Sequence, residues 1–283
     1  MAWIEIIKAI LFGIVEGITE WLPVSSTGHM ILFDEFVTLN LSEAFKSVFI
    51  VVIQLGAIMA VVLLYWHDIW PFPVKKNPKT GQKKMTVDKD IIDLWFKIIV
   101  ACIPAIIVGL PFEEKIDELF YNYQTVAIML IVVGIAFIVI ENRNKDIKPT
   151  ILSADKITYK DAFIIGLFQL IAAIFPGTSR SGATILGGIL IGLSRKVAAE
   201  FTFYLAVPVM FGASALKMFK ADYSLFTGLE WTVLLVGSVV AFLVSYVVIK
   251  KLMAYIRKND FKVFAYYRII LGIIVLLYFS IVK

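Results

Sequence analysis

The chain of 283 residues is 60% hydrophobic, has a mean hydropathy of +0.88 and carries a net charge of +5. A water-soluble domain is closer to half apolar, so this composition excludes a protein whose whole surface faces water. Most of the lysines lie in connectors between apolar segments, which indicates contact with a membrane surface and not with nucleic acid. The single cysteine, Cys102, excludes an internal disulfide framework. We therefore expect an integral membrane protein.

The apolar segments divide into long ones and broken ones. Six are long enough to cross a bilayer as helices: 44–66, 91–111, 123–140, 198–218, 229–250 and 262–282. Four are short or interrupted by polar residues, and they form two pairs: 1–21 with 24–39, and 160–175 with 182–194. Each pair meets at a cluster of Pro, Ser or Thr, and Gly. Such segments fit re-entrant helices better than complete spans.

The charges of the connectors predict the orientation. Four connectors are basic: 67–90, 141–160, 195–197 and 250–262. Connectors 33–43 and 112–122 are acidic instead. The positive-inside rule places the four basic connectors in the cytoplasm, and the six spans then thread consistently. The second broken pair must enter and leave from the cytoplasmic side. By analogy, we expect the first pair to enter from the outer side.

The two broken pairs also resemble each other in sequence. The stretch from Gly13 to Pro23 lies over the stretch from Gly166 to Pro176 at a constant offset of 153 residues, with Gly, Glu or Gln, and Pro in register. Each half then contains one hairpin and three spans. Three is an odd number, so the second half must be inverted relative to the first.

We therefore expect one all-α polytopic membrane domain over 1–283, with repeats of about 1–140 and 160–282. Six transmembrane helices plus two re-entrant helical hairpins would form an inverted-topology repeat, as in transporter-like folds. The functional site is expected where 23–29 and 176–182 meet near the middle of the membrane.

Two carboxylates open the first polar motif. Glu16 and Glu20 are four residues apart and share one helix face within an apolar segment. Two such groups repel each other unless a cation lies between them or a proton is shared. Mg²⁺ or Ca²⁺ suits these oxygen ligands. The alternative is a pair that reaches the outer interface or forms a structural ion pair.

Hydroxyl groups and a histidine complete the first motif. Ser25, Ser26 and Thr27 follow Pro23, and together with backbone N–H groups they would attract an anion at the start of a helix. An ordinary N-cap is the alternative, although a cap needs only one hydroxyl. His29 lies in the next turn beside these groups, which favours a chemical role over a structural one.

The second motif contributes a cation. Arg180 is the only charge between Asp161 and Arg195, and its planar guanidinium matches phosphate geometry. The hydroxyl residues around it are Thr178, Ser179 and Ser181. The alternative is a structural pair with Glu16 or Glu20. The two roles are compatible if Arg180 pairs with a carboxylate when the site is empty.

Both motifs resemble those of the undecaprenyl-diphosphate phosphatase family, also called the bacitracin-resistance type. The resemblance rests on the stretches 16–29 and 176–184 and extends to Gln54-Leu-Gly-Ala57, Ala199-Glu-Phe-Thr-Phe203, Pro208 and Tyr267-Arg268. It implies a multi-pass protein of the bacterial plasma (inner) membrane, with its active site on the outer side. The expected reaction is hydrolysis of undecaprenyl diphosphate to undecaprenyl phosphate and phosphate, which recycles the lipid carrier for cell-wall synthesis.

The residues and the resemblance together define the expected site. The expected catalytic residues are Glu16, Glu20, Ser26, His29 and Arg180. The expected substrate ligands are Ser25, Thr27, Thr178, Ser179 and Ser181. Glu16 and Glu20 would hold the divalent cation. The nucleophile is left open among Ser26, His29 and water.

Two rival functions use the same motifs. A lipid-phosphate flippase or transporter is the main one, because the inverted repeat is typical of transporters. A non-catalytic membrane protein is the other, but it would have no reason to bury these charged groups. The expected partners are a polyprenyl diphosphate lipid and bilayer lipids. A homodimer is one of the oligomeric states that the sequence leaves open.

Overall fold

The structure, a computed structural model, describes residues 2–76 and 83–282. Its long helices are α1 (Ala2–Thr19), α2 (Ser26–Phe36), α3 (Glu43–Leu64), α5 (Lys89–Phe120), α6 (Tyr123–Arg143), α7 (Tyr159–Ile174), α8 (Arg180–Leu190), α9 (Arg195–Lys220), α10 (Gly228–Ile256) and α11 (Lys262–Val282). The smaller elements are α4 (Trp66–Ile69), the 3₁₀ helices η1 (Ala154–Lys156) and η2 (Tyr223–Leu225), and strands β1 (Val74–Lys76) and β2 (Lys83–Met85). The described part of the chain is therefore helical apart from its connectors and one hairpin.

The helices begin at capping residues that the sequence supplies. Ser42, Asn122 and Ser194 each accept a hydrogen bond from the backbone N–H three residues further on, which satisfies a donor that the helix leaves free. Thr158 and Thr227 form capping boxes with the acidic residue three positions later. Polar caps thus set where the long helices start.

Six helices in the described residues are long and apolar enough to cross a membrane. They are α3, α5 over Lys89–Gly109, α6, α9, α10 and α11 over Lys262–Ile281. These correspond one by one to the six predicted spans, so that prediction is confirmed. The four remaining long helices, α1, α2, α7 and α8, are the two predicted pairs of broken segments.

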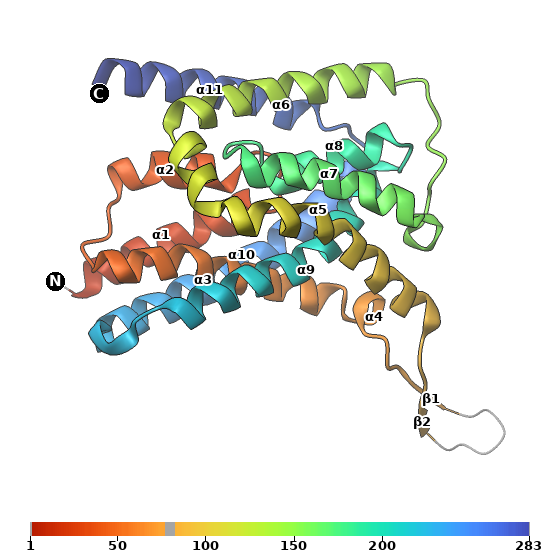
Figure 1. Ribbon diagram of the computed structural model, residues 1–283, viewed down its shortest axis with the longest axis horizontal. Helices are drawn as coiled ribbons and strands as arrows, with labels where there is room; N and C mark the ends of the chain where they lie inside the picture. The colour runs from red at the N-terminus through yellow and green to blue at the C-terminus, as the bar shows by residue number, and fades with distance from the viewer. Residues whose placement is uncertain (1, 77–82, 283) are drawn as a thin grey trace.

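Each broken pair is interrupted by a short non-helical stretch. We call residues 20–25 the first break and residues 175–179 the second break. In Figure 1, α1 and α2 lie at the left, where both chain termini are found, and α7 and α8 lie further to the right. The segments 65–76, 83–88, 144–158 and 257–261 occupy the right-hand half of the same view. The basic connectors are therefore grouped at one end of the molecule.

Glycine allows several helices to approach closely. An added Cβ at Gly13 of α1 would lie 2.6 Å from the carbonyl oxygen of Gly237 in α10. An added Cβ at Gly166 of α7 would lie 2.5 Å from that of Ala101 in α5. Small residues at these crossings permit the close backbone packing by which helices associate in a bilayer. Each broken pair is thereby held against a long helix from the other half of the chain.

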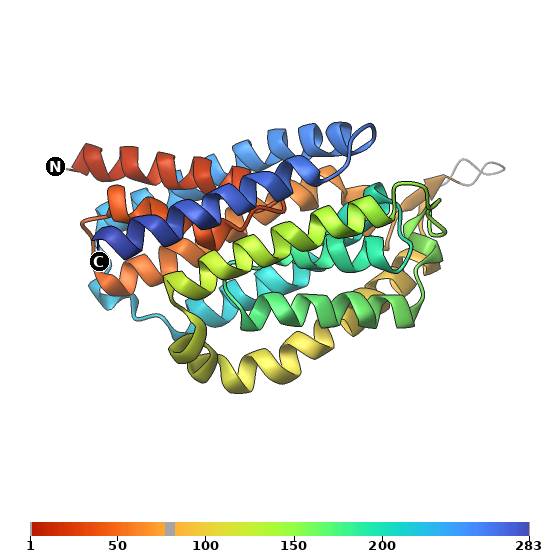
Figure 2. The same ribbon diagram turned by 90° about the horizontal axis from the view of Figure 1, so that it is seen from above.

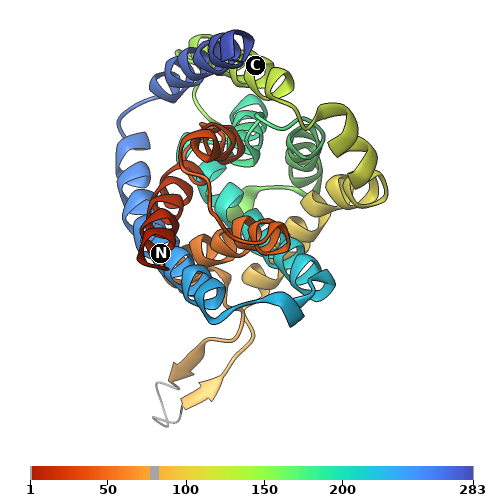
Figure 3. The same cartoon turned by 90° about the vertical axis from the view of Figure 1, so that its left-hand side faces the viewer.

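The last helix forms a similar close pair with α6. In Figure 2, α6 and α11 run side by side across the face of the molecule. Gly134 approaches the carbonyl oxygen of Ala265, and Gly272 approaches that of Ala127. Seen along the helices in Figure 3, this pair lies on the side opposite the projecting hairpin of β1 and β2.

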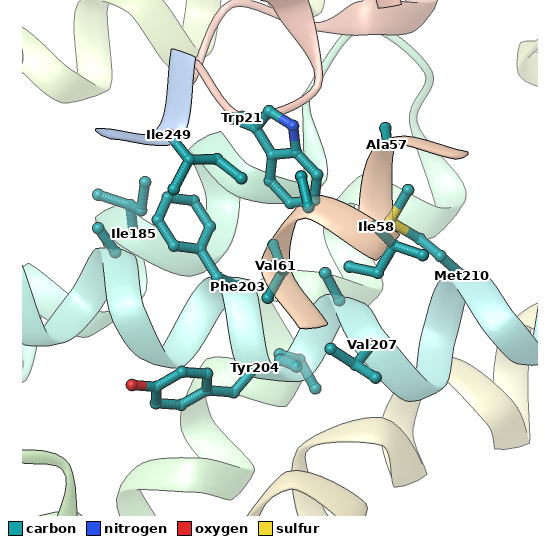
Figure 4. Close-up of a cluster of buried hydrophobic side chains, with 14 of the residues drawn as sticks. Trp21, Ala57, Ile58, Val61, Ile185, Phe203, Tyr204, Val207, Met210 and Ile249 are labelled. Carbon is teal, nitrogen blue, oxygen red and sulfur yellow. The ribbon is translucent and has the colours of Figure 1, made fainter. Parts of the chain in front are cut away.

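Trp21 fixes the first break to the core of the bundle. Its indole ring is fully buried and meets the ring of Phe203 edge to face, with centroids 5.6 Å apart. Figure 4 shows Val61 and Ile249 beside it, so that α3, α9 and α10 all surround this one side chain. Dense packing of this kind restricts the backbone on either side. The neighbouring Glu20 is therefore held at a defined place.

Two connectors differ from the expectation. The segment 112–122 was expected to link two spans, but α5 continues through Pro111 to Phe120. Its acidic residues and Lys115 favour helix, and a proline inside a membrane helix is tolerated when its neighbours compensate. In the segment 67–90, Val74 pairs with Met85 in an antiparallel hairpin that helical periodicity did not predict.

Candidate functional site

The two breaks end in the same local geometry. Ser25 and Ser179 have φ angles of 71° and 70°, and no other non-glycine residue in the described chain has a positive φ. The Ser25 hydroxyl accepts a hydrogen bond from Gly28 N at 3.2 Å, and the Ser179 hydroxyl accepts one from Gly182 N at 3.1 Å. Such a backbone is uncommon for a side chain with a Cβ atom and frequently marks functional sites. Each break therefore presents the N-terminus of a short helix, α2 or α8.

The first break contacts Ser181 at the start of α8, two residues after the second break. Ser181 Oγ lies 3.2 Å from the carbonyl oxygen of Glu20 and 3.1 Å from that of Leu22. Because a carbonyl only accepts, the Ser181 hydroxyl donates to this part of the first break. Residues 159 to 161 positions apart in the sequence thus form one polar site.

Glu20 lies at the centre of that site. Its Oε1 accepts a hydrogen bond from Arg180 Nη2 at 2.8 Å, and its Oε2 accepts one from Ser26 Oγ at 2.6 Å. The side chains of Arg180 and Glu20 are only 14% and 9% exposed. Charge-assisted hydrogen bonds with little surrounding water are strong and well oriented. One carboxylate therefore links a cation and a hydroxyl from opposite halves of the chain.

A cavity of about 190 Å³ borders this group. Five of the predicted site residues line it: Glu20, Ser26, Thr27, Ser179 and Arg180. Gln54 of α3 adds a polar group, and the apolar part of the wall comes from α7 and α9, including Val209 and Met210. A small cavity with a guanidinium, hydroxyls and helix N-termini suits a phosphate group.

Three predicted ligands lie outside the lining of this cavity. Ser25 is 1% exposed and uses its hydroxyl as a helix cap, whereas Ser181 uses its hydroxyl to join the two breaks. Thr178 is also 1% exposed, and its hydroxyl has no hydrogen-bond partner among the described residues. Direct contact of these three residues with substrate stays a prediction.

His29 faces a different neighbour from the rest of the motif. Its Nδ1 lies 2.7 Å from the carbonyl oxygen of Ser25, and its Nε2 lies 2.7 Å from the hydroxyl of Tyr267. Since the carbonyl can only accept, Nδ1 carries the proton and Nε2 accepts from Tyr267. The two rings are stacked, with centroids 5.5 Å apart. Both residues line a second, largely apolar groove of about 440 Å³ between α1 and α11.

Glu16 is the most isolated polar group of the site. Its side chain has no exposed surface, and neither carboxylate oxygen accepts a hydrogen bond from an N–H or hydroxyl group of the described residues, so only a shared carboxyl proton could bond it to Glu20. It interacts electrostatically with Glu20 and Arg180. A buried carboxylate without partners is costly unless it takes up a proton or a cation. The described residues contain no group of three or more His, Cys, Asp or Glu side chains that could hold a metal ion. A divalent cation at Glu16 and Glu20 therefore stays a prediction.

The structure also brings in residues to which the sequence assigned no role. Arg268 of α11 reaches both breaks, and the adjacent Tyr267 reaches His29. The signal was present in the sequence, because Arg268 is the only charge between Lys262 and Lys283. The same isolation had singled out Arg180.

Sequence comparisons with known proteins identify the family of this chain. The family model described as "Bacitracin resistance protein BacA" matches residues 9–274. "Undecaprenyl-diphosphatase" of Desulfitobacterium hafniense (strain DSM 10664 / DCB-2) is 65% identical over 280 residues, which cover 99% of this chain and 98% of that protein. "Undecaprenyl-diphosphatase 1" of Clostridium acetobutylicum is 61% identical over 282 residues and 100% of both chains. "Undecaprenyl-diphosphatase" of Enterococcus faecalis is 56% identical over 275 residues and 97% of both chains. The chain belongs to the bacitracin resistance protein BacA family.

Proposed function

We infer that this chain is an undecaprenyl-diphosphatase of a bacterial membrane, which converts undecaprenyl diphosphate to undecaprenyl phosphate and inorganic phosphate. Full-length relatives at 56–65% identity carry that name. The observation that carries the chemistry is Glu20 held between Ser26 and Arg180 at the edge of a small cavity. The product of the reaction, undecaprenyl phosphate, is the lipid carrier that cell-wall synthesis reuses.

The diphosphate is bound by Arg180 and by the N-termini of α2 and α8. Arg180 Nη1 donates to the carbonyl oxygen of Thr202 at 3.2 Å, which holds the guanidinium plane beside the cavity. The remaining donors can turn to phosphate oxygens when substrate replaces the carboxylate of Glu20 as the anion. Thr27 and Ser179 add hydroxyl groups from the cavity wall.

Ser26 is the nucleophile and Glu20 is its general base. The distance of 2.6 Å between Ser26 Oγ and Glu20 Oε2 suits transfer of the hydroxyl proton. The Ser26 oxygen bonds to the terminal phosphorus, the bond from that phosphorus to the bridging oxygen breaks, and undecaprenyl phosphate leaves. Water then releases phosphate from the serine, and Glu20 returns the proton to Ser26. Arg180 neutralises charge on the transferred group.

His29 acts in this scheme by positioning. Its two ring nitrogens are occupied by Ser25 and Tyr267, so neither is directed at the cavity beside Glu20. The bond to the Ser25 carbonyl oxygen steadies the turn that carries Ser26. A phospho-enzyme trapped with a denaturant at neutral pH should carry an acid-stable label on Ser26. An acid-labile label, as on histidine, or no burst of labelling would contradict this assignment.

Glu16 and Glu20 would hold a divalent cation, Mg²⁺ or Ca²⁺. When bound, such an ion supplies positive charge to phosphate oxygens. The unpartnered oxygens of Glu16 are the observation that favours it. Removal of divalent cations by a chelator should abolish phosphate release, and Mg²⁺ or Ca²⁺ should restore it. Glu16→Gln should raise the cation concentration needed for half-maximal activity, and an unchanged requirement would contradict the assignment.

The two halves form an inverted repeat in which both broken pairs are re-entrant hairpins. The shared turns at Ser25 and Ser179 support this, and so do the matching glycine crossings at Gly13 and Gly166. The two turn serines are one position further apart than the offset of the sequence alignment, because two residues separate Pro176 from Ser179 and only one separates Pro23 from Ser25. The grouped basic connectors favour an orientation in which the opposite end, with the open side of the first hairpin, lies outside the cell.

Cysteine labelling tests this orientation. Cys102 is buried, and Cys102→Ser gives a background without reactive thiols. In that background, Thr38→Cys and Asp222→Cys should react with an impermeant reagent on intact cells. Ser153→Cys, at the basic end, should react only after permeabilisation. The reverse pattern would place the active site on the cytoplasmic side.

Phosphate release from undecaprenyl diphosphate by the purified protein in detergent tests the function. Release that is lost in Glu20→Gln and Arg180→Ala supports the hydrolase. A protein that moves lipid phosphate across vesicles without releasing phosphate would be a flippase instead. The relatives described above are named as diphosphatases, and none of these three is named as a transporter.

A further inference from the structure

Arg268 is a charged residue that the proposed mechanism does not use. It lies in the apolar helix α11, and its side chain has no exposed surface. It forms no ion pair with any carboxylate of residues 2–76 and 83–282. A buried guanidinium without a counter-charge is expensive, so its retention needs a specific reason.

Backbone carbonyl groups take the place of a carboxylate. Nη1 donates to Pro23 O at 3.0 Å, and Nη2 donates to Gly177 O at 2.9 Å and Thr178 O at 2.8 Å. Two longer contacts of 3.4 Å reach the carbonyl oxygens of Met129 and Leu130 in α6. One side chain thus holds the first break, the second break and α6 together.

Glycines make room for this arrangement. An added Cβ at Gly182 would lie 2.8 Å from Nη1 of Arg268. Gly177 has a φ of 90°, and an added Cβ there would lie 2.4 Å from the carbonyl oxygen of Val126. A side chain at either position would displace the second break from α6 or from the guanidinium. The second break is therefore shaped around Arg268.

We propose that Arg268 is a positioning residue, which fixes the first break against the second so that Ser26 and Glu20 face Arg180. Arg268 does not line the cavity beside Glu20, so it acts through the two breaks and not by touching substrate. The residues that it aligns come from opposite halves of the chain, and their separation is not set by local sequence. This proposal rests on the proposed function, in which that cavity is the active site.

The geometry also explains why arginine is needed. A guanidinium presents five N–H donors in one plane, so it can reach carbonyl groups on three segments at once. A lysine ammonium would place its three donors at a single point and could reach fewer of these carbonyl groups. Arg268→Lys should therefore preserve the charge and lose the alignment.

The first experiment compares Arg268→Met and Arg268→Lys with Arg257→Met. Arg257 is exposed in the connector after α10, so its variant controls for loss of an arginine. At a temperature well below the melting point of each variant, kcat should fall about a hundredfold for both Arg268 variants, as for a displacement of about 1 Å. KM should change much less. Wild-type kcat in a folded Arg268→Lys protein would overturn the proposal.

The second experiment separates alignment from stability. Arg268→Ala leaves a guanidinium-shaped space, and guanidinium at low, non-denaturing concentrations should restore part of kcat with saturation. Ammonium at equal ionic strength should not. Restored thermal stability without restored kcat would show a merely structural role. If wild type itself released no phosphate, the proposed function would fail instead.

Gly182 supplies a third, independent variant. Gly182→Ala should lower kcat severalfold, because the new methyl group pushes Nη1 away from Pro23. In the Arg268→Met background the same change should add little, since that contact is already lost. Purely additive effects of the two substitutions would contradict the proposed alignment, even if Arg268→Met alone folded poorly.

Discussion

The first and second breaks have nearly the same backbone turn and different chemistry. Ser25 and Ser179 share a φ of about 70° and the same side-chain cap to a glycine three residues on. Around the first turn lie the carboxylate of Glu20 and the hydroxyl of Ser26. Around the second lies the guanidinium of Arg180, which meets that carboxylate.

The same turn, used twice, thus contributes different chemical groups to one site. The turns at Ser25 and Ser179 have the same structural role, because each exposes a helix N-terminus at the middle of the bundle. In the proposed mechanism, Glu20 and Ser26 beside the first turn and Arg180 beside the second turn have different roles in the reaction. In the proposed mechanism, Ser26 follows the first break and Arg180 follows the second, so the reaction requires the two breaks to lie together.

The largest expected effect comes from Ser26, the proposed nucleophile, which directly follows the first turn. Ser26→Ala should lower kcat by on the order of 10⁴-fold or more, because covalent catalysis is lost. Steady-state phosphate release and acid-quenched phospho-enzyme measure the two consequences. Ser47→Ala, an exposed hydroxyl bonded within α3, is the matched control and should retain full activity. Retained activity in Ser26→Ala would transfer the attack to water or another residue.

The cation of the second turn should have the next largest effect. Arg180→Ala should lower kcat/KM by about a thousandfold, since one charge that stabilises the transferring phosphoryl group disappears. Arg143→Ala, on an exposed arginine at the end of α6, serves as the control. Kinetics with a short-chain isoprenyl diphosphate measure the change. A loss confined to protein stability would reduce Arg180 to a structural partner of Glu20.

A side chain at Gly177 in the second turn should have a measurable cost in stability. Gly177→Ala combines a positive φ with a Cβ that meets Val126, and it should destabilise the protein by about 3 kcal/mol. Thermal unfolding in detergent measures this. Gly212→Ala is the control, because an added Cβ there meets no atom within 4 Å. Equal stability of the two variants would show that the second turn can relax.

The smallest effects should come from the two caps. Ser25→Ala and Ser179→Ala should each lower stability by about 1 kcal/mol, because the cap is lost at a strained φ. Ser25→Gly and Ser179→Gly should cost only a few tenths of that amount, as glycine accepts a positive φ. Parallel behaviour at both positions in thermal unfolding would strengthen the equivalence of the turns. A clear difference between them would weaken it.

Much of the architecture could be read from local sequence. The six spans were predicted within a few residues, because apolar length and loop charge determine what crosses a bilayer. Continuation of α5 beyond Pro111 was missed, since a proline inside a helix normally ends or kinks it. The hairpin of β1 and β2 was missed as well, because its short strands lack a clear alternating pattern.

The polar groups that lie among apolar segments could be found from local sequence, because few other charges surround them there. Glu20, Ser26 and Arg180 were all identified in this way. Three pairings became visible in the folded structure alone. Arg180 pairs with Glu20 and not Glu16, and His29 faces Tyr267. Arg268 joins the two breaks. These pairings connect residues up to 245 positions apart, and their geometry depends on how the helices pack.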